Sequence, residues 1–201
     1  MQSTNTKLIS KIETPRLILQ PIKLEDANAY WKAESASITE MSPYWSWAKS
    51  GKSIDDVKEF INFSLECHMK ERPEQMFFSL FSKNDSRFLG LIWIIRINWF
   101  VPFFEFAYWL DTRETGKGYM TEAVNALSRG CFIIYKAKRI EIKIFVNNNK
   151  SKAIPVKLGF NMEGELENYF INFVNKKVTN GLLYACCNIN NLPALKINID
   201  E

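Results

Sequence analysis

The order of secondary-structure signals in this chain predicts a mixed α/β (α+β) fold. Three strand-like runs, at 76–82, 87–97 and 103–110, follow one another across turn residues, as in an antiparallel meander. An amphipathic helical pattern over 119–135 comes next, and the alternating run 139–146 follows it. A strand that reaches the next strand through a helix is most simply a parallel βαβ crossover. We therefore expect antiparallel strands joined to a parallel one, with helices packed on the sheet.

The first part of the chain is expected to supply a strand and two helices. Residues 1–12 are expected to form a loosely held tail, and RLILQPI at 16–22 alternates as a strand. LEDANAYWKA then reads as a helix with Asp26 as its cap. Ser53 and Asp56 form a capping-box pattern that begins an amphipathic helix of about 18 residues.

The last part is expected to form a short helix and a closing hairpin. Cap-forming residues at 147–151 begin the helix, and Gly159 ends it. The runs 160–173 and 177–187 then read as two antiparallel strands.

Composition narrows the class of protein. A hydrophobic content of 47% suits one core, so we expect a single domain over 1–187 and a polar C-terminal tail over 188–201. A net charge of +4, with scattered basic residues, argues against direct nucleic-acid binding. The first residues lack the apolar region of a signal peptide, and Arg96 and Glu105 interrupt the most apolar window. We expect a cytoplasmic protein without a membrane span.

The cysteines and the single histidine do not have the spacing of a metal site. Cys67, Cys131, Cys186 and Cys187 include no C-x-x-C pair, and His68 alone cannot complete a zinc site beside Cys67. We expect no metal, reduced structural thiols and a partly buried, structural His68.

The junction 103–124 carries the strongest functional signal. A strand ends at Leu110, a turn containing Gly116 and Gly118 follows, and a helical pattern begins at once. Such a junction directs unpaired backbone N–H groups and the positive end of the helix dipole at one point, where a phosphate can bind. The glycines lack a Cβ, so the backbone can approach that phosphate closely. Lys117 either adds positive charge there or is simply solvated.

The loop 41–51 is rich in aromatic residues. Its Tyr44, Trp45 and Trp47 either cover the core or form a wall of the substrate site.

Six motifs occur in order: TPRL at 14–17, EFAYWL at 105–110, R-x-x-G-x-G at 113–118 followed by TEA, RIEI at 139–142, N-x-x-S at 148–151, and KLGF with MEG at 157–164. The glycine pattern alone is weak evidence, but the ordered set is specific. From about Thr14 to Ala185 the chain resembles the GNAT family of acyl-CoA-dependent N-acetyltransferases, and within it the RimJ/RimL-like branch.

The resemblance implies a mostly antiparallel, seven-stranded mixed sheet, splayed between strands 103–110 and 139–146. The resemblance also implies acetyl-CoA as the cofactor, with its pantetheine arm in that gap and its pyrophosphate at the glycine turn. The expected cofactor contacts are Trp109, Leu110, Asp111, Arg113, Glu114, Thr115, Gly116, Lys117, Gly118, Tyr119, Met120, Asn148 and Ser151.

The chemistry requires a neutral amine, a polarised thioester carbonyl and a proton for the departing thiolate. Glu105 is the candidate base, with a solvent-side strand carboxylate as the alternative reading. A backbone N–H within 109–111 is expected to polarise the carbonyl. Many relatives protonate the thiolate with a tyrosine where this chain has Pro155, which leaves Ser151 as the expected hydroxyl, or as a helix cap. Tyr169 is a spare acid or a wall residue.

A covalent route through Cys131 is disfavoured, because this thiol lies on the packed face of its helix. We therefore expect direct attack in a ternary complex. The resemblance favours the α-amino group of a protein or peptide as acceptor, a ribosomal protein among them, bound near Tyr44, Trp45 and Trp47.

Two alternatives stay open at this point. One is a small amine acceptor, such as a polyamine, an amino acid or an aminoglycoside. The other is a CoA-binding module without turnover, which is motivated by departures from the family pattern at Pro155, Phe170 and Asn180. The chain is expected to be a monomer or a homodimer.

Overall fold

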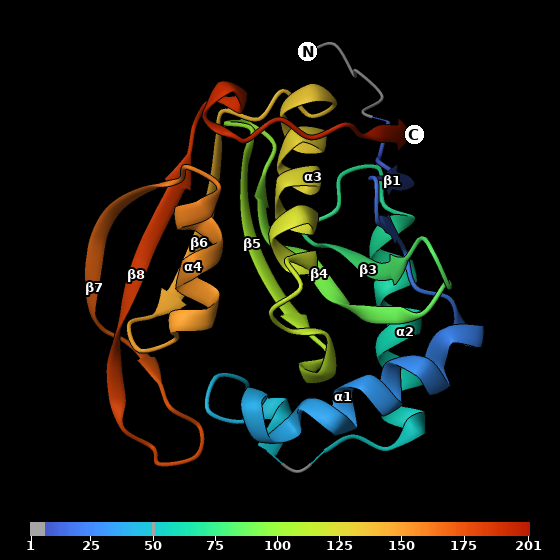
Figure 1. Cartoon of the computed structure of the whole chain (residues 1–201), viewed down its shortest axis with the longest axis vertical. Helices are drawn as coiled ribbons and strands as arrows, with labels where there is room; N and C mark the ends of the chain where they lie inside the picture. Colours follow the sequence, from blue (N-terminus) through green and yellow to red (C-terminus); the bar gives the residue numbers. More distant parts are fainter. Residues whose placement is uncertain (1–6, 50) are drawn as a thin grey trace.

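The computed structural model describes residues 7–49 and 51–201, and within them nine strands form one sheet in the order β7-β8-β6-β5-β4-β3-β2-β1-β9. Figure 1 shows the sheet with α3 and α4 in front of it. The strands are β1 (Lys11–Glu13), β2 (Leu17–Gln20), β3 (Met76–Ser82), β4 (Phe88–Asn98), β5 (Phe103–Leu110), β6 (Arg139–Phe145), β7 (Asn161–Ile171), β8 (Val178–Cys186) and β9 (Asn198–Asp200).

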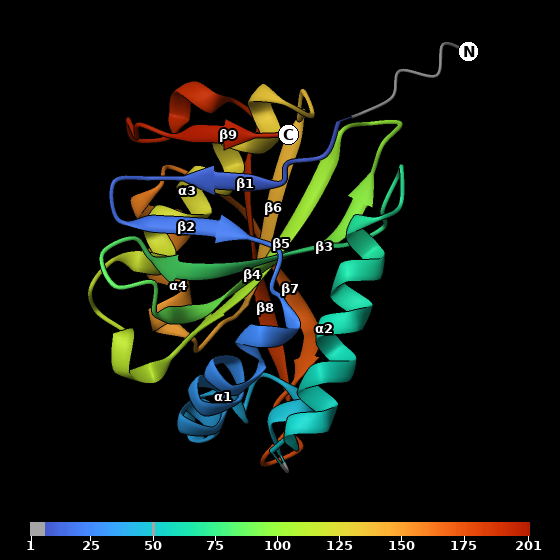
Figure 2. The same cartoon turned by 90° about the vertical axis from the view of Figure 1, so that its right-hand side faces the viewer.

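Helices cover both faces of the sheet. The α-helices are α1 (Ala27–Met41), α2 (Ile54–His68), α3 (Tyr119–Ile133) and α4 (Asn149–Lys157). Figure 2 shows the sheet edge-on, with α3 and α4 on one side and α2 on the other. Each face has its own apolar core: Leu127 and Phe104 belong to the core beneath α3, while Tyr30 and Trp109 belong to the core beneath α1 and α2.

The predicted splay is confirmed by the pairing of the two central strands. β5 and β6 are the parallel pair in the sheet, and their register runs from Phe103↔Arg139 to Phe106↔Ile142. β5 continues to Leu110, paired only with β4 on its other side. The second half of β5 therefore leaves backbone groups that face a gap rather than a neighbouring strand.

The sheet has nine strands rather than the expected seven because both ends of the chain join it. Residues 188–201, expected to be a polar tail, contain the 3₁₀ helix η4 (Ile189–Asn191) and β9, which pairs with β1 through Ile12↔Ile199. These three-residue strands are held by main-chain pairing and have too few side chains to form a pattern. Of the expected N-terminal tail, residues 1–6 lie outside the described residues, as does Ser50 in the aromatic loop.

Of the caps predicted for α1 and α2, that of α2 is confirmed and that of α1 is not. The capping box at α2 is confirmed, because the N–H of Asp56 donates to Ser53 Oγ and the N–H of Ser53 donates to Asp56 Oδ2. Asp26 does not cap α1 with its side chain. It accepts from the N–H of Lys23 within the preceding 3₁₀ turn, η1 (Leu24–Asp26).

Two kinds of feature are not found among the described residues. No helix within 7–49 and 51–201 is long and apolar enough to cross a membrane. The same residues contain no group of three or more His, Cys, Asp or Glu side chains that could hold a metal ion. His68 is partly buried, and its Nε2 lies 3.0 Å from the backbone nitrogen and 2.7 Å from the carbonyl oxygen of Phe77.

Candidate active site

The glycine turn lies between η3 (Thr112–Glu114) and the first turn of α3. Gly116 and Gly118 have φ of +81° and +79°, in the left-handed region that L side chains rarely adopt. Gly118 is the N-cap of α3, so the free N–H groups of that helix begin directly after it. A Cβ at Gly116 would meet no atom within 4 Å. The turn therefore has room above it for a ligand.

The TPRL motif, at 14–17 between β1 and β2, makes hydrogen bonds that fix this turn. Thr14 Oγ1 donates to Glu122 Oε1 at 2.6 Å, and Arg16 Nε donates to Glu122 Oε2 at 2.6 Å. Arg16 Nη1 also donates to the carbonyl of Lys117 at 2.9 Å. The motifs TPRL and TEA were both visible in the sequence, but their contact joins residues 108 positions apart. Arg16 and Glu122 are thus positioning residues that the sequence reasoning did not identify.

The charged side chains of the turn neutralise one another. Arg113 holds the carboxylate of Asp111, with Nε 2.9 Å from Oδ1, which raises the pKa of the guanidinium further. Buried Glu114 accepts from Arg87 Nη1 at 2.6 Å and from Lys117 Nζ at 2.8 Å. Lys117 is therefore exposed to solvent but paired with Glu114. Backbone N–H groups are what the turn itself presents to a phosphate.

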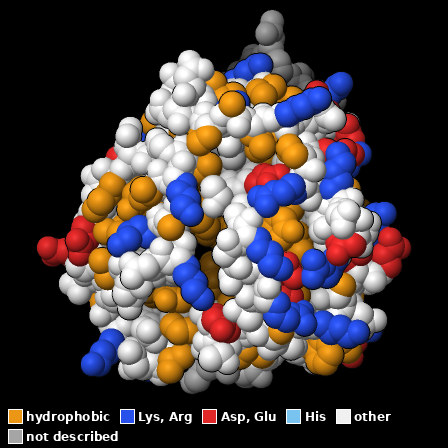
Figure 3. Space-filling view, viewed as in Figure 1, with side chains coloured by type: hydrophobic (Ala, Val, Ile, Leu, Met, Phe, Trp, Pro, Cys, Tyr) orange, Lys and Arg blue, Asp and Glu red, His pale blue; other side chains and the backbone are white. Residues whose placement is uncertain are grey.

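A cavity of 450 Å³ extends from the glycine turn into the gap beside β5 and along α4. We call it the cofactor cavity. Figure 3 shows a hollow on this face with Lys and Arg side chains around it; Lys150 and Lys157 line the cavity. Most of the expected cofactor residues line it too: Trp109, Leu110, Thr115, Gly116, Gly118, Tyr119, Met120, Asn148 and Ser151.

The free edge of β5 narrows the choice of carbonyl-polarising group. The N–H of Asp111 donates to Leu89 on β4 at 2.8 Å, so Asp111 is unavailable as the expected donor. Backbone groups alternate between the two sides of a strand, which directs the N–H of Leu110 into the gap. The indole of Trp109 packs in the core beneath α1 and α2. Trp109 therefore lines the cavity mainly with its backbone.

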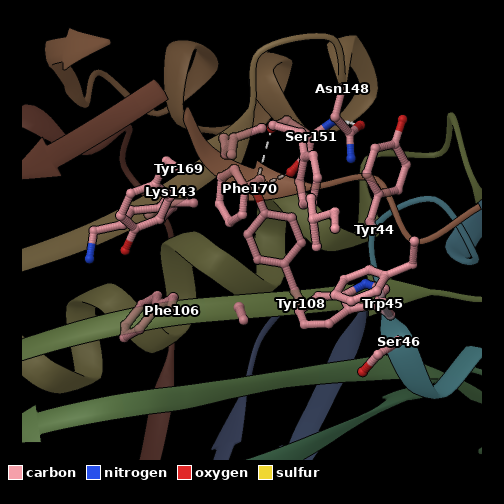
Figure 4. A pocket seen from close by; sticks show the side chains of 16 residues that line it. Tyr44, Trp45, Ser46, Phe106, Tyr108, Lys143, Asn148, Ser151, Tyr169 and Phe170 are labelled. Atoms are coloured by element: carbon pink, nitrogen blue, oxygen red, sulfur yellow. Dashed lines mark hydrogen bonds between the residues drawn. The ribbon is translucent and has the colours of Figure 1, made fainter. Parts of the chain in front are cut away.

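A second cavity of 390 Å³ lies between the aromatic loop, β5, β6 and β7. We call it the acceptor cavity. Figure 4 shows its labelled side chains, with Tyr44 and Trp45 at one end and Lys143 and Tyr169 at the other. The two cavities share Tyr44, Trp45, Tyr108, Asn148 and Ser151. A ligand in one cavity can therefore reach a ligand in the other.

Tyr108 and Ser151 meet where the cavities join. Ser151 Oγ donates to Tyr108 Oη at 3.1 Å, and Tyr108 Oη donates to the carbonyl oxygen of Ser151 at 3.3 Å. Burial raises the pKa of Tyr108 well above its ordinary value, so the phenol keeps its proton at neutral pH. Asn148 caps α4 by accepting from the N–H of Ser151 at 3.1 Å. The expected alternative of capping thus applies to Asn148, whereas the Ser151 hydroxyl is directed at Tyr108.

Glu105 has a different setting from the one expected of a base. It is buried, and its Oε2 lies 2.9 Å from Lys143 Nζ and 3.0 Å from Arg96 Nη2. Both cations contact the same carboxylate oxygen. Lys143, not Glu105, is the group from this cluster that lines the acceptor cavity. Burial alone would lower the pKa of Lys143, but the hydrogen bond and charge of Glu105 outweigh it, and that pKa is raised.

Of the residues expected to line the acceptor site, three line the cavity and one lies behind it. Tyr44, Trp45 and Tyr169 line the acceptor cavity, with Tyr169 half exposed. Trp47 stacks behind Trp45, with 6.0 Å between ring centroids, and so supports the wall rather than forming it. Cys131 is fully buried, and burial raises the pKa of its thiol. This is consistent with the expectation that no covalent intermediate forms on it.

Comparison with known proteins gives the family. Residues 16–161 match the family model described as an acetyltransferase (GNAT) domain. A probable N-acetyltransferase of Bacillus subtilis, YjcK, is 33% identical over 134 residues, which cover 65% of this chain and 68% of that protein. The ribosomal-protein-serine acetyltransferase of Escherichia coli is 27% identical over 139 residues, or 69% and 74% of the two chains.

Solved structures agree on the fold. The ribosomal L7/L12 alpha-N-protein acetyltransferase RimL, solved with coenzyme A, superposes with a TM-score of 0.79 at 18% identity, over 88% of this chain and 96% of its own. The glycine turn, the splayed strands and the two adjoining cavities agree with these matches. The chain belongs to the GNAT family of acetyltransferases, in its RimJ/RimL-like branch.

Proposed function

We propose that this enzyme transfers an acetyl group from acetyl-CoA to the α-amino group of a protein or peptide, by direct attack. One observation carries the proposal: the cofactor cavity and the acceptor cavity adjoin and share lining residues, Tyr108 and Ser151 among them. Acetyl-CoA supplies the acetyl group as a thioester. The residues present fit it, because a glycine turn with free N–H groups and an unpaired strand edge complement phosphates and pantetheine amides.

The chain's own groups have separate tasks. The N–H of Leu110 polarises the carbonyl under attack. The hydroxyls of Tyr108 and Ser151 hold two protons at the junction of the cavities; one goes to the leaving sulfur, and the proton lost by the attacking nitrogen replaces it. Trp45 and Tyr44, which reach both cavities, exclude water from the point of transfer.

The acceptor's own acidity favours an α-amine. An α-amino group has a pKa of about 7.7 to 8.0, against about 10.4 for a lysine side chain, so roughly a tenth or more of it is neutral at pH 7. Apolar surroundings lower the pKa of an amine further. With Glu105 tied to Lys143 and Arg96, an amine that needs little help in losing its proton suits this site.

The relatives support the same acceptor class. The similar proteins from Escherichia coli and the RimL structure are named for acetylation of ribosomal proteins, RimL at the α-amino group. A ribosomal protein N-terminus is therefore the macromolecular acceptor to test first.

The test is acetylation of matched acceptors with acetyl-CoA, followed by free-thiol release and mass spectrometry. The acceptors are a lysine-free peptide with a free N-terminus, an Nα-blocked peptide containing lysine, spermidine and an aminoglycoside. We expect acetylation of the free α-amine alone. Turnover only with spermidine or the aminoglycoside would replace this acceptor class. A thermal shift with CoA but no thiol release from any acceptor would identify a binding module instead.

A further inference from the structure

The acceptor cavity is bounded by a continuous series of aromatic rings. Tyr44 meets Phe145 edge-on with 5.0 Å between centroids, Phe145 stacks on Phe170 at 4.1 Å, and Phe170 meets Tyr169 edge-on at 4.9 Å. Trp45 lies near Tyr108, at the same end of the cavity as Tyr44 (Figure 4). Two of these rings stand on the aromatic loop and three on β6 and β7, so one surface is assembled from three parts of the chain.

The sheet is shaped to hold Phe170 in this place. The β7–β8 register shifts between Leu166 and Phe170, and Asn168 there has φ of +52°. The side chain of Asn180 fixes this bulge by accepting from the N–H of Asn168 at 3.0 Å. Gly181 leaves the space beneath, since a Cβ there would lie 2.9 Å from the ring of Phe170. Phe170 and Asn180, the two departures from the family pattern on β7 and β8, thus act together: Asn180 holds the bulge that places the Phe170 ring.

The rim of the cavity is tied across its mouth. The N–H of Phe173, just past β7, donates to the carbonyl of Pro43 at 3.0 Å. This bond joins the β7–β8 turn to the aromatic loop that carries Tyr44 and Trp45. The aromatic walls are therefore held at a set spacing before an acceptor arrives.

The cavity has little free charge. Its described lining contains no carboxylate, and its cation, Lys143, already lies 2.9 Å from Glu105 and 3.7 Å from Glu141. A polycation would lose water here without gaining an ion pair. Apolar and aromatic groups lose nothing comparable and gain contact with the rings.

We propose that the acceptor presents its amine next to a large apolar or aromatic group, which packs between Trp45 and the Phe145–Phe170 pair. The cavity, at 390 Å³, lies within the usual range of about 300 to 1,000 Å³ for small-ligand sites. For a peptide acceptor, this makes the first side chain the specificity determinant, with Phe, Trp or Leu preferred over Ser, Asp or Lys. The proposal rests on the α-amine acceptor proposed above.

The experiment compares kcat/KM for peptides that differ only in the first residue: Phe, Trp, Leu, Ser, Asp and Lys. We expect the apolar set to exceed the polar set by about 10-fold or more, the scale of discrimination set by apolar pockets. Phe170→Ala should reduce that ratio, Phe170→Leu should retain part of it, and neither should change KM for acetyl-CoA. Phe100→Ala, at a residue 89% exposed on the β4–β5 turn, is the matched control.

The outcomes separate the two proposals. A Ser or Lys peptide that equals the Phe peptide, or a preference for apolar residues unchanged in folded Phe170→Ala and Phe170→Leu, overturns the aromatic acceptor class. Circular dichroism and melting of both variants establish that they are folded. Failure of every peptide, with spermidine or an aminoglycoside acetylated instead, overturns the α-amine acceptor itself.

Discussion

The hydroxyl of Tyr108 donates to the carbonyl oxygen of Ser151, across the gap between β5 and α4, at 3.3 Å. In a regular helix that carbonyl would accept from the N–H four residues later, which is Pro155 and has none. The proline therefore leaves an acceptor that the tyrosine of a distant strand uses. A tyrosine hydroxyl stands at the junction of the two cavities, carried by β5 instead of α4.

Tyr108→Phe keeps the ring and removes the hydroxyl, so we expect kcat to fall by about 100-fold, at the lower end of proton-transfer contributions. Ser151→Ala should cost a similar factor. Because the two hydroxyls share one hydrogen bond, the double variant should lose less than the product of the single losses. Steady-state thiol release measures all three, and losses that multiply would show that the hydroxyls act independently.

Pro155→Ala restores an N–H opposite the carbonyl of Ser151, and a new intrahelical bond should stabilise the protein by about 1 kcal/mol. The Tyr108 hydroxyl then shares the carbonyl oxygen of Ser151 with the new N–H. Urea unfolding should show the added stability while kcat falls, with Val156→Ala, on the exposed side of α4, as control. A Pro155→Ala enzyme with unchanged kcat would mean that the Tyr108 bond to this carbonyl has no part in catalysis.

Gly116→Ala places a methyl group where no protein atom lies within 4 Å, at a cost of about 1 kcal/mol for the left-handed backbone. The added methyl group then occupies part of the space above the glycine turn where the pyrophosphate would bind, so KM for acetyl-CoA should rise about 10-fold or more. KM for the acceptor should stay the same. Gly51→Ala is the control for backbone strain, because Gly51 also has a positive φ but lies at the end of the aromatic loop, away from the glycine turn. An equal KM in wild type and Gly116→Ala would argue against pyrophosphate binding at this turn.

Glu105→Gln distinguishes a base from a positioning residue. The carboxylate holds Lys143 and Arg96, so its loss should lower kcat/KM less than about 10-fold, well short of a typical base. The rise of kcat/KM with pH should persist, because it follows the acceptor amine, neutral above about pH 8. Glu163→Gln, whose carboxylate pairs with Arg139 at the surface, is the matched control. Loss of the pH dependence in Glu105→Gln alone would restore its assignment as base.

His68 should make stability pH-dependent. Burial lowers its pKa in the folded protein, so the unfolded chain binds the proton more readily. Its contribution is full above the unfolded pKa of about 6.5 and is lost as the pH falls further. Urea unfolding between pH 7 and 5 should show a steeper decline for the wild type than for His68→Gln. Parallel declines would assign the pH dependence to other groups.

Local signals in the sequence were sufficient for the elements that local interactions build. The capping box of Ser53 and Asp56 involves residues three positions apart, and it forms as predicted. The glycine turn depends on the backbone freedom of Gly116 and Gly118, which belongs to those residues themselves. The alternation along β5 and β6, with a helix between them, was enough to predict a parallel pair. The sequence by itself therefore determined the strand, turn and helix on the cofactor side, but not the contacts of Arg16 and Glu122 that fix the turn.

Tertiary structure alone decided the acceptor side. The Tyr108–Ser151 pair joins residues 43 positions apart, and the ring series joins Tyr44, Phe145 and Phe170 from three elements. No periodicity links such residues, because their contact depends on how far β6 parts from β5 and where β7 bulges. The same is true of Glu105, whose partners Arg96 and Lys143 come from the strands on either side. Whether a side chain is a base, a brace or a wall depends on its neighbours across the sheet, and the fold supplies those neighbours.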